Sequence, residues 1–133
     1  MAEGRKDDQG KLRFDLIPPG PLEELARVYT IGAAKYADRN WENGLQWGRV
    51  FAALMRHAWA FWRGERFDPK DGQHHLASVC WTAMALMEYE RTHPELDDRN
   101  EEARNRAGTA DASQAFYVSS EERSSAQIVP PQG

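Results

Sequence analysis

The sequence lacks the features that define several classes of protein. Its one cysteine, Cys80, excludes an internal disulfide framework and a cysteine-rich zinc site. No apolar run approaches the roughly 18 residues that a membrane span requires, and the opening MAEGRKDDQG has no apolar core of a secretory signal. With 17 basic and 21 acidic residues the net charge is −4, which argues against binding nucleic acid through bulk charge. We therefore expect a cytoplasmic protein whose partner is neither a membrane nor a nucleic acid.

Apolar residues recur at helical spacing in three segments, 22–37, 49–63 and 73–91. No stretch alternates with a period of two for long enough to predict a strand. The sequence therefore predicts an all-α fold, a small helical bundle with three main helices. Because the 64–72 connection is short, the second and third helices should form an antiparallel hairpin. The residues expected in the buried stripes are Leu22, Leu25, Tyr29, Ala33 and Tyr36 in the first segment, Phe51, Leu54, Met55, Ala58, Trp59 and Trp62 in the second, and Leu76, Val79, Cys80, Ala83, Met84 and Met87 in the third.

The ends of the helices and of the domain carry their own signals. Gly64 is a natural stop for the second helix, and Asp71 is a candidate N-cap for the third. Residues 1–98 are expected to form one domain, and residues 99–133, rich in Ser, Ala and charge, a flexible C-terminal tail. About ninety ordered residues give a thin core, which favours completion of the bundle by oligomerisation. In the alternative, a fourth helix from 95–107 closes a monomer.

Two polar segments carry cations that plain packing does not require. The first is an extended arm over residues 8–15, where a glycine between basic residues presents Lys11 and Arg13 to a phosphate. The second, over residues 32–44, combines cations and an amide with aromatic rings, as neutralisation of a phosphate and stacking on a base require. Its candidate residues are Lys35, Tyr36, Arg39, Asn40 and Trp41. The alternatives are a solvated arm and a helix end whose cations interact with the helix dipole.

A third polar group brackets the connection between the second and third helices. It consists of Arg56, His57, Glu65, Asp68, Asp71, His74 and His75. Carboxylate oxygens suit Mg²⁺ or Mn²⁺, and imidazole nitrogens shift the preference toward Mn²⁺, Co²⁺ or Zn²⁺. A metal here would neutralise a phosphorylated substrate and activate a water. In the alternative, His57 is a core histidine, and His75 shares a buried polar stripe with Ser78 and Thr82.

Several short motifs follow one another along the first ninety or so residues. They read DQGKLRFDLIPP (8–19), GAAKY (32–36), RNWENG (39–44), RH (56–57) and GERFDPKDGQHHLA (64–77). This order resembles the phage dATP/dGTP diphosphohydrolase family, the MazZ-like proteins, which are grouped with the MazG-like all-α nucleoside triphosphate pyrophosphohydrolases. The resemblance covers about residues 7–90.

The resemblance implies hydrolysis of dGTP and dATP to the monophosphate and pyrophosphate with a divalent metal. In phages whose DNA carries 2-aminoadenine in place of adenine, the dGMP formed in this way feeds synthesis of the unusual nucleotide. MazG-like enzymes are dimers or tetramers, which agrees with the thin core expected here. For a phage protein, the expected compartment is the cytoplasm of the host cell.

The metal ligands cannot be transferred from the MazG-like motif. That motif usually has Glu-x-x-Glu on one helix and Glu-x-x-Asp on the next. This chain has no Glu-x-x-Glu, and its Glu-x-x-Asp matches are Glu65–Asp68 and Glu95–Asp98, the second of which directly precedes the expected tail. The acid–histidine group between the second and third helices is therefore the expected centre.

The leading hypothesis gives each candidate residue a role. Mg²⁺ or Mn²⁺, with Co²⁺ or Zn²⁺ as further options, is expected to bind Glu65, Asp68, Asp71 and His75. The expected catalytic residues are His57, Glu65, Asp68 and His75. The expected substrate-binding residues are Lys11, Arg13, Lys35, Tyr36, Arg39, Asn40, Trp41 and Arg56. The alternative hypothesis is a helical module that binds a nucleotide or a protein without catalysis.

Overall fold

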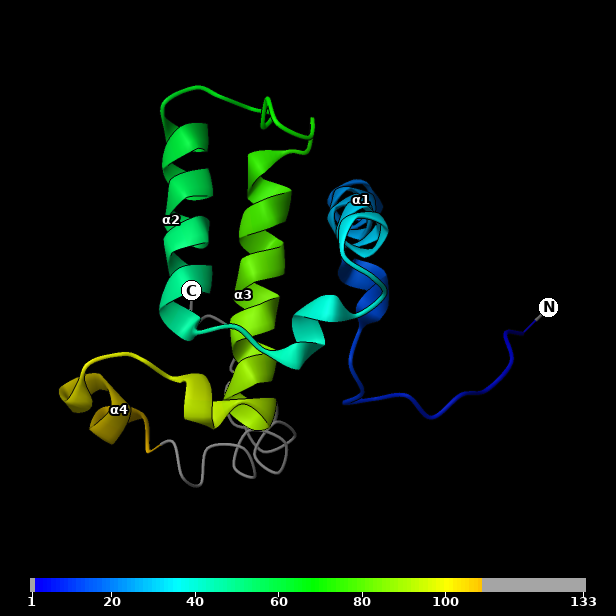
Figure 1. Cartoon of the computed structure of the whole chain (residues 1–133). Coiled ribbons are helices and arrows are strands. Elements are labelled where there is room, and N and C mark those ends of the chain that lie inside the picture. Colours follow the sequence, from blue (N-terminus) through cyan, green and yellow to red (C-terminus); the bar gives the residue numbers. More distant parts are fainter. Residues whose placement is uncertain (1, 109–133) are drawn as a thin grey trace, which may run out of the picture.

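The computed structural model of the chain describes residues 2–108 (Figure 1). Its elements are η1 (Phe14–Leu16), α1 (Pro19–Lys35), η2 (Asn40–Asn43), α2 (Trp47–Trp62), α3 (His75–Thr92), η3 (Pro94–Leu96) and α4 (Glu101–Ala107). In Figure 1, α2 and α3 run antiparallel side by side, and α1, seen nearly end-on, packs on the other side of α3. No strand occurs within these residues, so the predicted all-α fold and its hairpin are confirmed. None of the helices in this part of the chain has the combined length and apolar character needed to cross a membrane.

The helix boundaries follow local chemistry. α1 begins at Pro19, three residues before the predicted start, because proline is favoured in the first turn, where its missing N–H costs nothing. α2 ends at Trp62, one residue before the predicted end, and the predicted stop at Gly64 has a φ of +103°, a left-handed conformation that glycine adopts without strain.

The predicted N-cap of α3 is wrong. The cap is His74, whose Nδ1 accepts a hydrogen bond from the Leu76 N–H at 3.0 Å. Asp71 instead accepts from the Gln73 N–H at 3.0 Å. The helix starts later than its pattern predicts because the preceding residues turn back and pair His74 with Phe67 in an isolated antiparallel bridge.

The hydrophobic core lies between α2 and α3, toward the end where η2 and η3 meet them. Its buried members are Trp47, Val50, Ala85 and Tyr89. The Tyr89 hydroxyl donates to the Trp41 carbonyl oxygen at 2.5 Å, and the Trp47 Nε1–H donates to the His93 carbonyl oxygen at 3.2 Å. The polar atoms of both large rings therefore have partners, as buried polar groups require.

The face of α3 that is buried differs from the predicted one. Its buried residues are His75, Ala77, Ser78, Thr82, Ala85 and Tyr89. Most of them are small or polar, and Thr82 satisfies its hydroxyl locally by donating to the carbonyl oxygens of Ser78 and Val79 at 3.0 and 2.7 Å. The alternative in which His75 shares a buried polar stripe with Ser78 and Thr82 is confirmed.

The apolar stripes expected to be buried are largely exposed in the single chain. On α2, the exposed fractions are 54% for Phe51, 55% for Trp59 and 78% for Trp62. Met84 and Met87 of α3 are also exposed, and α1 has no fully buried residue. The prediction was wrong because hydrophobicity identifies which residues avoid water but not whether the covering surface belongs to the same chain.

A fourth helix occurs within the segment expected to be flexible. α4 is capped by Asn100, whose side chain accepts from the Ala103 N–H at 2.9 Å. It has no buried residue and lies apart from the other helices in Figure 1, so it does not close the bundle as the alternative proposed. The rest of the expected tail, residues 109–133, lies outside the described residues.

The chain between α3 and α4 holds the N-terminal end of α2. Asp98 accepts from the Gly48 N–H at 2.8 Å, and a side chain at Gly48 would come within 3.0 Å of this carboxylate. The buried Asp97 carboxylate binds the Arg99 guanidinium through two hydrogen bonds of 2.9 and 2.8 Å. The Arg99 guanidinium in turn lies 4.9 Å from the centre of the Trp47 ring. The hydrogen bond from Arg99 lowers the pKa of Asp97.

Asp97→Asn is expected to lower the free energy of unfolding by about 1–3 kcal/mol at neutral pH, because it removes a charged hydrogen-bond acceptor. Since the folded-state pKa of Asp97 is lowered, its contribution is present above the unfolded pKa of about 3.9 and is lost as the pH falls. Urea unfolding followed by circular dichroism should therefore show a smaller difference between variant and parent at low pH. Asp38→Asn, at an exposed acid before η2, is the control, and an equal difference at both pH values would contradict the prediction.

Candidate metal centre

Two histidines and two carboxylates meet where the α2–α3 hairpin turns. The His57 Nδ1 of α2 lies 2.8 Å from the Nδ1 of His75, the first residue of α3. The Nε2 of His75 lies 2.7 Å from Oε1 of Glu65 in the connecting loop. His57, Asp68 and His75 each offer one ligand atom, and these atoms lie within 4.8 Å of one another.

The loop between α2 and α3 folds so that Asp68 faces the helices. The Asp68 N–H donates to the Gln73 carbonyl oxygen at 2.8 Å, and the His75 N–H donates to the Arg66 carbonyl oxygen at 3.0 Å. Gly72 closes the turn with a φ of +75°, and its N–H donates to the Asp68 carbonyl oxygen at 2.7 Å. These bonds leave Asp68 half-buried beside the two imidazoles.

Gln73 is a polar residue of this loop that sequence reasoning missed. Its side-chain nitrogen donates to the Asp71 carbonyl oxygen at 3.2 Å. Its Oε1 is buried and has no hydrogen-bond partner among the described residues. No spacing rule in the sequence distinguishes such a glutamine from an exposed one.

When both imidazoles are neutral, the hydrogen bonds determine which ring nitrogen of each carries the proton. A Glu65 carboxylate can only accept, so the Nε2 of His75 carries a proton. In neutral His75 the Nδ1 is then an acceptor, and it receives the Nδ1–H of His57. The chain of hydrogen bonds ends at the Nε2 of neutral His57, which keeps a free lone pair.

The surroundings favour neutral His57. Burial lowers its pKa most, the neighbouring His75 lowers it further, and Arg56 lowers it slightly. Asp68 and Asp71 act in the opposite direction, but the net effect is a lowered pKa. A neutral imidazole is the form that binds a metal ion or accepts a proton.

The donor set fits a divalent transition metal. The set consists of two imidazole nitrogens and a carboxylate oxygen within 4.8 Å, and it suits Mn²⁺, Co²⁺ or Zn²⁺ better than Mg²⁺. Mg²⁺ prefers a site made only of oxygen ligands. Glu65 holds His75 in the way that carboxylates hold metal-ligating histidines in known centres. Asp71 is exposed and is not one of the three residues whose ligand atoms lie within 4.8 Å of one another, so its expected role as a ligand stays a prediction.

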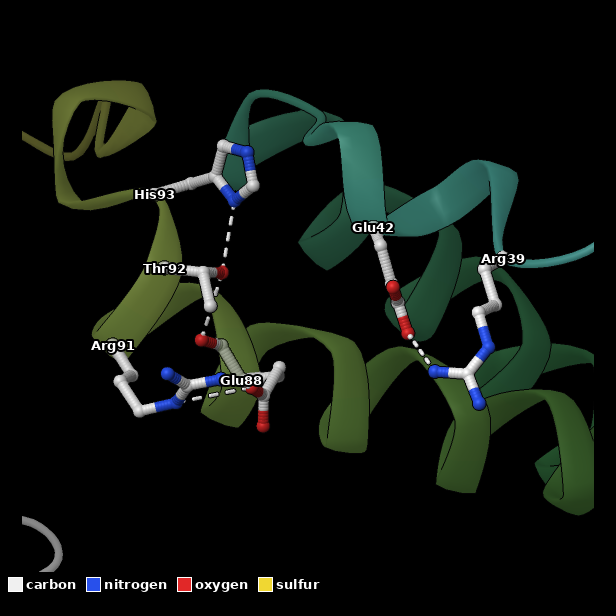
Figure 2. Close-up of polar contacts among 6 residues, drawn as sticks. All are labelled: Arg39, Glu42, Glu88, Arg91, Thr92 and His93. Atoms are coloured by element: carbon white, nitrogen blue, oxygen red, sulfur yellow. Dashed lines mark hydrogen bonds and ion pairs between the residues drawn. The ribbon is translucent and has the colours of Figure 1, made fainter.

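Most of the expected substrate-binding residues lie away from this centre. Arg39 and Trp41 line a pocket of about 480 Å³ together with Glu88, Arg91 and Thr92. Figure 2 shows this region, where Arg39 forms an ion pair with Glu42 at 3.2 Å. Glu88 is thirteen residues beyond His75, which corresponds to about 20 Å along α3.

The remaining expected residues are also distant or exposed. Arg13 forms an ion pair with Asp15 in the exposed N-terminal arm that also carries Lys11. The Lys35 Nζ lies 5.1 Å from the centre of the exposed Tyr36 ring, and Asn40 begins η2. Only Arg56, which directly precedes His57, adjoins the cluster in the sequence. The substrate roles of all these residues stay predictions.

The fold and the cluster define a class, that of all-α proteins with a candidate metal centre at the turn of a helical hairpin. The chain matches the family described as dATP/dGTP diphosphohydrolase, N-terminal, over residues 1–99. It belongs to this family, so the resemblance of its motifs is confirmed.

A phage relative supports the same assignment. The chain is 38% identical over 96 residues to a dATP/dGTP diphosphohydrolase of Salmonella phage PMBT28. The alignment covers 72% of this chain and 33% of that protein, so the chain spans about a third of the relative's length. No solved structure matches the chain.

In the metal-free protein, His57 is expected to titrate below the ordinary histidine pKa of about 6.5. His75→Gln should raise this pKa, because once His75 is protonated its positive charge disfavours a second charge on His57, and glutamine carries no such charge. Titration of the imidazole C–H resonances by NMR measures both values. A His57 pKa at or above 6.5 in the parent protein would contradict the described environment.

Proposed function

We propose that the chain hydrolyses dATP and dGTP to the monophosphate and pyrophosphate at the cluster of His57, Asp68 and His75. The observation that carries the proposal is this convergence of two imidazoles and a carboxylate within 4.8 Å in a chain of the dATP/dGTP diphosphohydrolase family. The substrates are those after which the relative from Salmonella phage PMBT28 is named. In a phage that uses 2-aminoadenine, the dGMP product would feed synthesis of that nucleotide.

His57, Asp68 and His75 would hold the divalent ion, Mn²⁺ or Mg²⁺, with Co²⁺ and Zn²⁺ as further options. Such an ion, when bound, neutralises a triphosphate and lowers the pKa of a water. Glu65 keeps the proton on Nε2 of His75, so an ion would bind the Nδ1 lone pair of His75 in place of its hydrogen bond from His57. Direct binding of the ion by Glu65 or Asp71 is a further option that the sequence suggested.

The reaction adds a water oxygen to the α-phosphorus and breaks the bond from that phosphorus to the oxygen that bridges the α- and β-phosphates, which leaves as a terminal oxygen of pyrophosphate. Arg56, next to His57, supplies a positive charge for the phosphates. The lone pair on Nε2 of neutral His57 can bind the ion or accept the proton of the water. These two roles differ in what a His57→Gln variant loses: metal affinity in the first case, turnover alone in the second.

Asp68→Asn is expected to reduce turnover of dATP and dGTP by at least about 100-fold, because Asp68 is the carboxylate of the cluster formed with His57 and His75. The measurement is separation of products by ion-exchange chromatography after incubation with Mn²⁺ or Mg²⁺. Mn²⁺ affinity, from calorimetry, should fall in the same variant. Asp38→Asn, outside the cluster, serves as the control.

Two results would count against the proposal. Release of inorganic triphosphate in place of pyrophosphate would indicate a different hydrolase. Nucleotide binding without turnover would favour the alternative, a non-catalytic binding module. This alternative is worth testing because the chain spans only about a third of the relative's length.

We further propose that two or more copies of the chain associate through the exposed apolar face of α2 and α3, as a dimer or tetramer. Large apolar side chains of both helices are 47% or more exposed, namely Phe51, Trp59 and Trp62 of α2 and Met84 and Met87 of α3, and a contiguous apolar surface of this kind is typical of an interface. Burial of such a face against a copy of itself would complete the thin core.

Trp59→Glu is expected to shift the protein toward the monomer, because a carboxylate on this face cannot be buried without a partner. Size-exclusion chromatography with light scattering gives the mass of each species. Asn105→Glu on α4 adds the same charge outside the face and should leave the mass unchanged. A monomeric parent protein at micromolar concentration would exclude the association.

A further inference from the structure

A groove along α2 has two cations in its lining, and apart from Arg56 its lining residues have no role in the proposed metal centre. It has a volume of about 310 Å³ and lies along α2 where Trp81 of α3 approaches it. Part of its lining is small or apolar, from Ala52, Ala53 and Leu45. Arg49 and Arg56 line it as cations. Trp81 is half-buried, and Tyr29 contacts it edge-on with 6.5 Å between ring centres.

The two arginines of the groove are not neutralised by the protein. Neither Arg49 nor Arg56 forms an ion pair or a side-chain hydrogen bond with any residue between 2 and 108, whereas Arg13, Arg39 and Arg99 each pair with a carboxylate. Unpaired guanidinium groups beside an indole and small side chains suit a flat ligand with a negative charge.

The groove lies on the same two helices as the candidate metal centre. Arg56 precedes His57 in the sequence, and Trp81 follows His75 by six residues, or about 9 Å along α3. Arg49 lies a further two turns from Arg56, about 10 Å along α2. The order from the cluster is therefore a cation, an aromatic and small-residue surface, and a second cation, over a length that one nucleotide can span.

We propose that this groove binds the nucleoside part of a purine deoxynucleotide, an inference that rests on the proposed function. The base lies between the Trp81 indole and the surface of Ala52 and Ala53. Arg56 binds the α-phosphate beside the metal centre, and Arg49 reaches the edge of the base.

The chemistry of Arg49 gives the groove a base preference. Guanine presents two acceptors, N7 and O6, side by side, which match the paired donors of a guanidinium. Adenine presents an acceptor and an amino donor at the same positions, so a guanidinium meets only one of them favourably. Arg49 therefore favours guanine over adenine.

Binding without metal separates this proposal from the chemistry. Full-length protein in EDTA is titrated with dGMP, dAMP or inorganic pyrophosphate, and affinities are measured by calorimetry. The expected result is tighter binding of dGMP than of dAMP. Arg49→Gln should weaken dGMP binding about tenfold and remove the preference, a loss in the range of one bidentate base contact. Arg27→Gln, at a cation of α1 outside the groove, is the matched control.

The indole N–H resonances locate the base. In a ¹⁵N-labelled protein, Trp81→Phe identifies the Trp81 signal, and dGMP should shift that signal through the ring current of the base. A shift confined to Trp41, or binding of pyrophosphate but not of dGMP, would overturn the proposal. Turnover with no Trp81 shift would reject the groove and leave the proposed function standing. A guanine-selective Trp81 shift without turnover would support the groove and reject catalysis.

Discussion

The close approach of α2 and α3 is the constraint on which the candidate site depends. Ser78, Thr82 and Ala85 form the middle of the buried stripe of α3, and their small size allows the two helices to lie near each other. Only at such a separation can His57 of one helix reach His75 of the other at 2.8 Å. Burial of Thr82 in this stripe is tolerated because its hydroxyl donates to carbonyl oxygens of its own preceding turn.

The loop between these helices positions the acidic residues of the candidate site beside the two histidines. Its backbone hydrogen bonds run from Asp68 to Gln73 and from His75 back to Arg66, so the acidic side chains of the loop are placed by main-chain geometry and not by their own flexibility. Glu65 remains half-exposed while the imidazole that it binds is buried. The cluster thus has one protected side, formed by the helices, and one side open to a ligand that arrives from water.

Much of this arrangement follows from the sequence pattern. Where the pattern fails to predict the structure, the failure has a specific physical cause. Periodicity located all three long helices, and Gly64 marked the end of α2, because these signals are local. The grouping of His57, Glu65, Asp68 and His75 was also predictable, since a short hairpin must bring its two ends together. The buried face of α3 was not predictable in this way. Leu76 and Met84 are more hydrophobic than Ser78 and Thr82, but the smaller Ser78 and Thr82 are the ones that are buried. Nor does the sequence reveal that Arg39 and Trp41 lie near the far end of α3, since that depends on where the chain crosses between α1 and α2.

The hydrogen bond between Asp98 and Gly48 has a consequence for how the domain is delimited. The first turn of α2 is capped by a carboxylate that comes fifty residues later in the chain. A fragment that stopped at the end of α3 would contain every long helix and every member of the histidine cluster, but the start of α2 would have lost the acceptor for its free N–H. A fragment that keeps this hydrogen bond must therefore extend through η3 to Asp98, and during synthesis the bond cannot form until that distant segment has left the ribosome.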